Sequence, residues 1–374
     1  MKLQLEKIEL YEIEMPLKAL FETSFGATAS RRVLLIRVRD KSGAHGWGEC
    51  VAMEQPFYNH ETIDTARVII SKFIAPMLAK ADVENAAEVS DALTAIQGNR
   101  MAIAAVEAAV WDMEAKMANL PLWQHLGGTR SEINCGVSIG LQKSPEILLE
   151  KVAREVESGY QRIKLKIKPR QDIEFVSFVR SHFPDITLSV DANSAYELTR
   201  DIELFEKLDD CNLLMIEQPL AAGDLVDHAK LQKRLKTPVC LDESITSLRD
   251  ARHALELEAC RIINIKLGRV GGHSEARAIQ TFAAERSVPV WCGGMLETGI
   301  GRAHNIALST LPGFTLPGDV SASSRYWEED IIEPPVVVSP EGTINAPKGF
   351  GIGYKVKENL IEKLAVKREN ISLA

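Results

Sequence analysis

The sequence predicts an α/β protein, a (β/α)7β-type TIM barrel that carries an α+β capping domain. Three observations lead to this fold class. The first part of the chain mixes strand-like and helix-like stretches. After it, short apolar runs recur at a nearly constant spacing, and a helix-like stretch follows each run. No hairpin signal separates these runs, so we expect parallel strands that close into a barrel and are covered by helices.

Residues 1–125 are expected to form the capping domain. Residues 7–17 (KIELYEIEMPL) and 31–40 (RRVLLIRVRD) are strand-like, and a turn at KSGAHG leads into WGEC. This order is typical of an antiparallel meander. Residues 61–118 change to helical periodicity and end in an alanine-rich run that Pro121 closes.

Residues 126–320 are expected to form the barrel. Its eight apolar runs are INCGVSIG, RIKLKIK, ITLSVDAN, LLMIEQP, TPVCLDES, RIINIKLG, VPVWCGG and FTLPGDV. From the second run onward, the residues that close them lie 24 to 27 positions apart: Lys166, Asp191, Glu217, Asp242, Lys266, Gly293 and Asp319. One strand, one helix and two loops need about that many residues. Residues 321–374 continue past the last strand and are expected to pack back on the capping domain.

The composition narrows the class of partner. The chain has 44 Lys and Arg against 52 Asp and Glu, a net charge of −8, which disfavours a nucleic-acid or anionic-membrane partner and favours a small molecule. Its six cysteines are scattered, without a C-x-x-C pair, so zinc sites and disulfides are disfavoured. We find neither a signal peptide nor an apolar run of about 18 residues, and expect a cytoplasmic protein.

Three carboxylates close successive strands of the predicted barrel. Asp191, Glu217 and Asp242 end the third, fourth and fifth runs, and active sites of such barrels lie at the carboxyl ends of the strands. Each acid alone is equally well explained as a helix cap or loop residue. Together they form a cluster that repels unless a cation binds it, and hard oxygen ligands favour Mg²⁺, with Mn²⁺ as a substitute.

Lysines alternate with apolar residues in the second run. RIKLKIK places Lys164, Lys166 and Lys168 on one face, which taken alone indicates a solvated edge strand. A barrel strand has no solvent face, so this face is expected to point into the barrel mouth, where carboxylates compensate it. Lys266 closes the sixth run, and the sixth strand lies four positions from the second in a ring of eight strands. Lys166 and Lys266 should therefore face each other across the mouth.

Two opposed ammonium groups beside a metal-bound carboxylate suit the abstraction of a proton α to a carboxylate, through an enediolate. An ordinary lysine, with a pKa of about 10.4, is a poor base at neutral pH. Desolvation and a nearby cation lower that pKa. Lys164 lies beside Lys166, and Arg269 follows Lys266 by three residues, so we expect the pKa of both candidate bases to be lowered.

Further residues are candidates for contacts in the mouth. Glu243 is expected either to contact Lys266 or to cap the next helix, and Asn193 either to orient a ligand carboxylate or to form a turn. Segments 21–32 and 51–60 are predicted to be loops that close over a substrate, with ordinary connecting loops as the alternative. The predicted substrate contacts are Ser138, Asn193, Gly293, Met295 and Glu297.

At these residues the sequence resembles the enolase superfamily, and within it the muconate-lactonizing subgroup with its K-x-K second strand. The matching motifs are KLK at 164–166, DAN at 191–193, EQP at 217–219, LDES at 241–244, NIK at 264–266 and, in the capping domain, GWGE at 46–49. Four longer stretches look like the o-succinylbenzoate synthase and N-succinylamino acid racemase branch: 21–26, 264–272, 293–305 and 316–327.

The resemblance implies a Mg²⁺-dependent dehydration of 2-succinyl-6-hydroxy-2,4-cyclohexadiene-1-carboxylate in menaquinone synthesis, by a homo-oligomer. Lys166 would remove the α-proton and return it to the departing hydroxyl, and Lys266 would stabilise the enediolate. Opposed lysines also serve a racemase, and Arg269 resembles a residue of the racemase-capable branch. A dedicated N-succinylamino acid racemase and a muconate cycloisomerase remain open. From another class, a non-catalytic barrel that binds a metal or an organic acid is the alternative.

Overall fold

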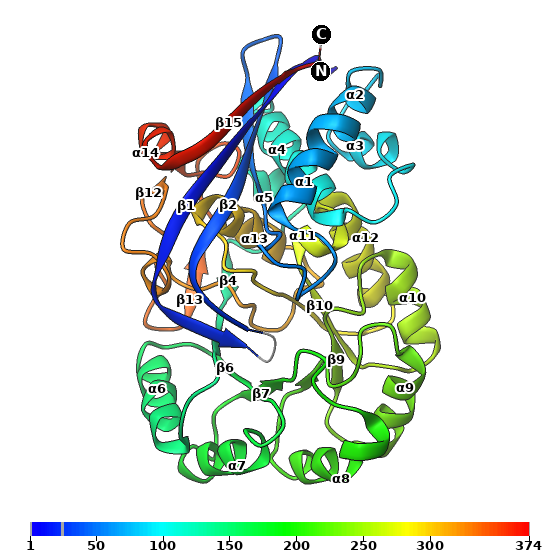
Figure 1. Cartoon of the computed structure of the whole chain (residues 1–374), viewed down its shortest axis with the longest axis vertical. Helices are drawn as coiled ribbons and strands as arrows, with labels where there is room; N and C mark the ends of the chain where they lie inside the picture. Colours follow the sequence, from blue (N-terminus) through cyan, green and yellow to red (C-terminus); the bar gives the residue numbers. More distant parts are fainter. Residues whose placement is uncertain (1, 24–25, 374) are drawn as a thin grey trace.

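The protein was analysed as a computed structural model that describes residues 2–23 and 26–373. An antiparallel sheet and its helices form the upper part of the view in Figure 1, and a curved parallel sheet surrounded by helices forms the lower part. This arrangement confirms the predicted capped barrel. No helix in the described ranges is both long and apolar enough to cross a membrane. All six cysteines are free and buried.

The antiparallel sheet joins the two ends of the chain. Its strand order is β15-β1-β2-β3, with bounds β15 (Ala365–Ser372), β1 (Leu5–Thr23), β2 (Gly26–Asp40) and β3 (His45–Cys50). The meander of β1 to β3 is therefore confirmed. β15 pairs antiparallel with β1 from Lys7↔Ser372 to Ile13↔Ala365, and Figure 1 shows the two strands side by side. The C-terminal segment thus returns to the N-terminal sheet, while the domain boundaries at 125 and 320 stay a prediction.

A long helix supports this sheet at short range. α4 (Arg100–Met117) packs on β3, and fourteen of its residues are buried. A Cβ on Gly46 would lie 2.0 Å from the Ala109 carbonyl oxygen, and one on Gly48 would lie 2.1 Å from that of Ala105. The two glycines of GWGE are therefore required by the close approach of strand and helix. The other helical segments here are α1 (Ile63–Ile69), the π-helix Ile70–Ile74, α2 (Ala75–Leu78), α3 (Ala87–Ala92) and α5 (Leu122–His125).

Seven parallel strands form most of the barrel wall. Their order follows the sequence: β5 (Gly136–Ile139), β6 (Arg162–Lys166), β7 (Leu188–Asp191), β8 (Ile216–Glu217), β9 (Val239–Leu241), β10 (Ile262–Ile265) and β11 (Val290–Cys292). Each coincides with one of the predicted runs. Outside the ring, β4 (Glu132–Asn134) pairs with β13 (Thr343–Asn345), and β12 (Ile332–Glu333) pairs with β14 (Lys355–Val356).

The eighth run closes the ring without forming a regular strand. Phe314 bridges to Val290 of β11, and Gly318 bridges to Cys135 beside β5, both in parallel. The Gly136 N–H donates to the Gly318 carbonyl oxygen at 2.7 Å. Pro317 lies between these bridges and has no N–H to donate, so a continuous hydrogen-bond ladder cannot form here. The eighth unit was predicted in the right place but with too regular a structure.

Helices cover the outside of the barrel, and Figure 1 shows α6 to α10 in an arc around the strands. Several of them begin at a side-chain cap, as Ser144, Asp224 and Ser247 show. The helices are α6 (Pro145–Glu157), α7 (Ile173–His182), α8 (Leu198–Asp209), α9 (Leu225–Arg234), α10 (Leu248–Glu256), α11 (Leu267–Val270), α12 (His273–Ala284) and α13 (Gly299–Ser309), followed by the 3-10 helix Ser323–Arg325 and α14 (Glu358–Leu364).

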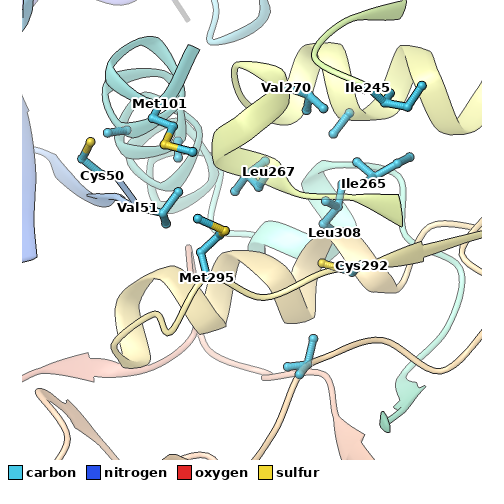
Figure 2. Packing of buried hydrophobic residues seen from close by; sticks show 14 of the residues in the cluster. Cys50, Val51, Met101, Ile245, Ile265, Leu267, Val270, Cys292, Met295 and Leu308 are labelled. Atoms are coloured by element: carbon cyan, nitrogen blue, oxygen red, sulfur yellow. The ribbon is translucent and has the colours of Figure 1, made fainter. Parts of the chain in front are cut away.

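Apolar side chains from both parts meet above the barrel. Figure 2 shows Val51 and Met101 of the capping domain near Leu267 and Met295 of the barrel, and all four are buried. Backbone polar groups are satisfied across the same boundary. The Glu49 carboxylate accepts hydrogen bonds from the N–H groups of Thr298 and Gly301 at the start of α13. The capping domain is thereby fixed over the carboxyl ends of the strands.

Candidate active site

The capping domain and the strand ends enclose a cavity of about 70 Å³. The barrel contributes three of the lysines that the charge pattern singled out, Lys164, Lys166 and Lys266, whereas the three predicted metal ligands are not among the lining residues. The capping domain contributes mainly apolar and aromatic side chains. Those that line the cavity are Phe21, Thr23, Thr28, Met53 and Tyr58. The cavity therefore combines a charged floor with a largely apolar cover, as small-molecule sites usually do.

Lys166 lies at the end of β6, directly beside the end of β7. Its backbone is in register with Asp191, and its Nζ lies 2.6 Å from Asp191 Oδ2. The same Nζ lies 2.7 Å from Oδ1 of Asn193. The amide of Asn193 in turn donates to Glu243 Oε1 at 3.0 Å. Lys166 is thus held in one position by neighbours from the next strand end.

Lys266 enters the same cavity from β10, four strands away in the ring. Its Nζ lies 2.8 Å from Asp242 Oδ2 and 4.6 Å from the centre of the Tyr58 ring. Burial alone would lower the pKa of Lys266, but Tyr58 and nearby carboxylates, Glu243 first, outweigh it and raise that pKa. The expected lowering by Arg269 is therefore wrong for Lys266, because the neighbours that raise its pKa outweigh burial.

Lys164 is buried among carboxylates rather than solvated. Its Nζ lies 2.7 Å from Asp319 Oδ2, 2.8 Å from Glu217 Oε2 and 3.2 Å from Asp191 Oδ2. Burial lowers the pKa of Lys164, and the three carboxylates more than reverse this effect. The solvated edge strand is thereby excluded for this residue. Lys168, the third lysine of the run, is about one-third exposed and lies near Glu22.

The three predicted metal ligands are buried at adjacent strand ends. Asp191 and Glu217 close β7 and β8 and are in register, and Asp242 follows β9. Burial raises the pKa of Asp191, but Lys166 and Lys164 outweigh it and hold that pKa well below the ordinary range. For Glu217, burial and Asp191 raise the pKa. Each carboxylate is hydrogen-bonded to a cation of the chain.

The donor chemistry of this arc fits a hard divalent cation. All three groups are carboxylates, whose oxygens Mg²⁺ prefers, and the other oxygen of Glu217 accepts from the Asn264 amide at 2.7 Å. In the described side-chain positions, however, no three His, Cys, Asp or Glu groups of residues 2–23 and 26–373 gather closely enough to hold an ion. The carboxylates instead face ammonium and guanidinium groups, so their role as ligands stays a proposal.

Arg269 and Glu243 surround Lys266 without touching it. Arg269 is buried, donates through Nε to the Ile245 carbonyl oxygen at 2.7 Å, and is paired with Asp242, the partner of Lys266. Glu243 does not cap the following helix, because Ser247 does so. Burial raises the pKa of Glu243, and its charge is felt by Lys266 across space. Glu243 thus affects the pKa of Lys266 through its charge, whereas Arg269 shares with Lys266 the partner Asp242.

Four of the five predicted substrate contacts line the cavity: Ser138, Asn193, Met295 and Glu297. The Ser138 hydroxyl is buried and has no hydrogen-bond partner in the described part of the chain. Asn193 has φ of 43°, so it forms a turn and also faces the cavity. Gly293 has a different role. A Cβ there would lie 2.3 Å from Oδ1 of Asn264 and 2.8 Å from Cε of Lys266, so this glycine makes room for both side chains.

Sequence reasoning missed several cavity residues, among them Tyr58, Asp319 and Arg302. Tyr58, within the predicted loop 51–60, reaches Asp242 at 3.1 Å. Asp319 closes the eighth run, and the strand-end rule applied to the other acids would have found it. Arg302 lies in a helix, where no strand-end signal points to it. The predicted loop 21–32 consists instead of the ends of β1 and β2, apart from residues 24 and 25, which lie outside the described residues.

Known proteins share both the fold and the sequence pattern. Residues 148–360 match the model of the enolase C-terminal domain-like family, and residues 7–127 match the N-terminal domain of mandelate racemase and muconate lactonizing enzyme. The chain is 52% identical to an o-succinylbenzoate synthase of Geobacillus kaustophilus, over 97% of this chain and 96% of that protein. It is 47% identical to an N-succinylamino acid racemase of Thermus thermophilus, over 97% and 98%.

A solved structure of an enolase superfamily member from Listeria innocua superposes with a TM-score of 0.96, at 45% identity and over the whole of both chains. The capped barrel, with lysines and carboxylates at its strand ends, defines the class of enolase-type enzymes. The chain belongs to the enolase superfamily, in the branch of the o-succinylbenzoate synthases and N-succinylamino acid racemases.

Proposed function

We propose that this chain is an o-succinylbenzoate synthase that also racemises N-succinylamino acids. One observation carries the proposal: Lys166 and Lys266 enter one cavity from strands on opposite sides of the ring, and each is held by a carboxylate. The relatives at 45 to 52% identity bear one or the other of these two names. The cyclohexadiene carboxylate named above is the substrate we assign.

In the synthase reaction, Lys166 as a neutral amine takes the proton α to the substrate carboxylate. Asp191 and Asn193 fix its Nζ, so the same nitrogen, now an ammonium, is positioned to protonate the hydroxyl that departs from the same face. Lys266, held over Tyr58, stabilises the negative charge of the enediolate from the other face. Mg²⁺ held by Asp191, Glu217 and Asp242 would supply further positive charge for that anion.

The racemase reaction uses the same two lysines differently. One lysine removes the α-proton, and the other delivers a proton to the opposite face of the planar intermediate. A specific observation favours this second activity: Arg269 is bound to Asp242, through which it can tune Lys266. A dedicated racemase and a muconate cycloisomerase use the same groups, so the substrate decides among them.

The test is an assay of the purified protein with Mg²⁺ and both substrates, following o-succinylbenzoate absorbance and the optical rotation of N-succinylphenylglycine. We expect both reactions, and we expect Lys166→Ala to abolish both. Lys168→Ala is the matched control, since this lysine of the same run pairs only with Glu22 among the charged groups described. If neither reaction occurs, the assignment fails and muconate-type lactones are the next substrates; a protein that only binds metal or organic acid would show no turnover.

Finer properties belong to the same proposal: Mg²⁺ dependence with Mn²⁺ as a substitute, a place in menaquinone synthesis, a cytoplasmic location and a homo-oligomeric state. The metal dependence is directly testable. Treatment with EDTA should remove synthase activity, and added Mg²⁺ should restore it. Activity that survives complete removal of divalent ions would contradict the role given to Asp191, Glu217 and Asp242.

A further inference from the structure

A buried arginine with an unused donor lines the candidate active site. Arg302 belongs to α13, and only 3% of its surface is exposed. Its Nη2 donates to the Glu297 carbonyl oxygen at 3.0 Å, and the guanidinium lies 5.5 Å from the centre of the Tyr326 ring. Its Nη1 is buried and has no hydrogen-bond partner in the part of the chain that the structure describes. A buried charged donor without a partner is costly, so this position favours a ligand that supplies one.

The other cations of the cavity are already paired. Nζ of Lys164, Lys166 and Lys266 each lies between 2.6 and 2.8 Å from a carboxylate oxygen. Arg269 and Arg325, close to the cavity, are paired with Asp242 and Glu155. Arg302 takes part in no ion pair among residues 2–23 and 26–373. Among the cations that line the cavity within these ranges, Arg302 is therefore the one available to neutralise a charge on a ligand.

We propose that Nη1 of Arg302 binds the distal carboxylate of the substrate, the one that takes no part in the reaction, and so selects acyl groups that end in a carboxylate. The inference rests on the proposed function, in which the reacting carboxylate lies among the lysines. Apolar cavity residues such as Phe21, Met53 and Met295 suit the carbon chain between the two charged ends. Arg302 is thus a specificity-determining residue rather than part of the proton transfer.

The test compares the binding of o-succinylbenzoate with that of its monoamide, in which the succinyl carboxylate is replaced by a carboxamide. Both are titrated calorimetrically into the protein with Mg²⁺. We expect the unmodified protein to bind the dicarboxylate more tightly than the monoamide. Arg302→Met should reduce the ratio of the monoamide Kd to the dicarboxylate Kd by roughly 10- to 100-fold, the range of a charge-assisted hydrogen bond. Arg252→Met, at an exposed position of α10, should leave the ratio unchanged.

Each outcome is decisive for this proposal. If Arg302→Met weakens both ligands equally, or leaves the ratio unchanged, Arg302 has a structural role and the inference is overturned. Arg302→Lys keeps the charge and should give an intermediate ratio, which preserves the test if the methionine variant does not fold. Synthase activity of the unmodified protein is measured in parallel. If the unmodified protein is active but Arg302→Met does not alter the Kd ratio, only the role of Arg302 is contradicted. If both activity and binding are absent, the proposed function is contradicted as well.

Discussion

The polar residues of the barrel mouth form a chain of alternating charges. Asp319 bridges Arg162 and Lys164, Lys164 reaches Glu217 and Asp191, and Asp191 reaches Lys166. Burial raises the pKa of Asp319, but the two cations outweigh it and hold that pKa well below its usual range. Because buried ions are stable only when they are paired, each member of this chain depends on the others.

Replacing Asp319 by Asn should therefore destabilise the protein strongly. The substitution leaves Arg162 with no carboxylate partner among the described residues and removes the shortest ion pair of Lys164. We expect a loss of about 3 kcal/mol in the free energy of unfolding, measured by urea denaturation. The control is Asp82→Asn, an exposed partner of Lys2 whose loss should cost less than about 1 kcal/mol. Equal losses in the two variants would contradict the pairing argument.

Residue types at strand ends were predictable, and side-chain partners were not. The positions of Lys166, Lys266, Asp191, Glu217 and Asp242 follow from where the apolar runs end, which is a local property of the sequence. Which cation faces which carboxylate depends on neighbouring strands and on Tyr58, from a segment far away in the chain. The direction of the pKa shift of Lys266 was wrong for this reason.

Among the elements of the capping domain, β3 and α4 are in close backbone contact. Ala at position 48 would place a Cβ 2.1 Å from a helix carbonyl oxygen and 3.0 Å from a helix nitrogen. Because neither backbone group can rotate away, we expect Gly48→Ala to cost at least about 2 kcal/mol in thermal or urea unfolding. Gly223→Ala is the control, since a Cβ there meets nothing within 4 Å. An unchanged stability of Gly48→Ala would show that the strand can shift.

A second property of the elements concerns pH. Glu107 of α4 accepts hydrogen bonds from the His273 and Ser274 N–H groups at the start of α12. Burial raises the pKa of Glu107 to about 7, above its ordinary value of 4.5, although these donors lower it. Between those two values the folded state binds more protons than the unfolded state, so stability should fall as pH rises through this window. Burial raises the pKa of Glu49 to about 7 in the same way.

The measurement is the free energy of unfolding at pH values from 5 to 8. Glu107→Gln should flatten the decline between about pH 4.5 and 7, whose limit is about 1.4 kcal/mol per pH unit for one group. A constant loss at all pH values is also expected, because the amide NH₂ cannot accept the helix N–H groups. Glu328→Gln, at an exposed position, should retain the slope of the unmodified protein. A slope unchanged in Glu107→Gln would show that this carboxyl stays ionised when folded.

On the scale of the whole molecule, the fold was predictable because the apolar runs, their spacing and the helix-like stretches between them all indicate the same fold. The 24- to 27-residue rhythm extends from the second run to the eighth, and six of these seven segments form strands of the parallel sheet. The eighth departs because Pro317 interrupts its hydrogen bonding, a local effect that the rhythm does not encode. The cover of the cavity was the least predictable part. It depends on how the ends of β1 and β2 and the segment at Tyr58 pack over the barrel, which only long-range contacts decide.

The central claim is that Lys166 and Lys266 act on opposite faces of the substrate, one lysine on each face. It is tested most directly by following α-proton exchange of each N-succinylphenylglycine enantiomer in D₂O by NMR, with Mg²⁺ present. The unmodified protein should exchange both enantiomers. Lys166→Ala should lose exchange of one enantiomer, and Lys266→Ala should lose exchange of the other. Loss of the same enantiomer in both variants, or unchanged exchange in either, would contradict two opposed lysines acting on separate faces.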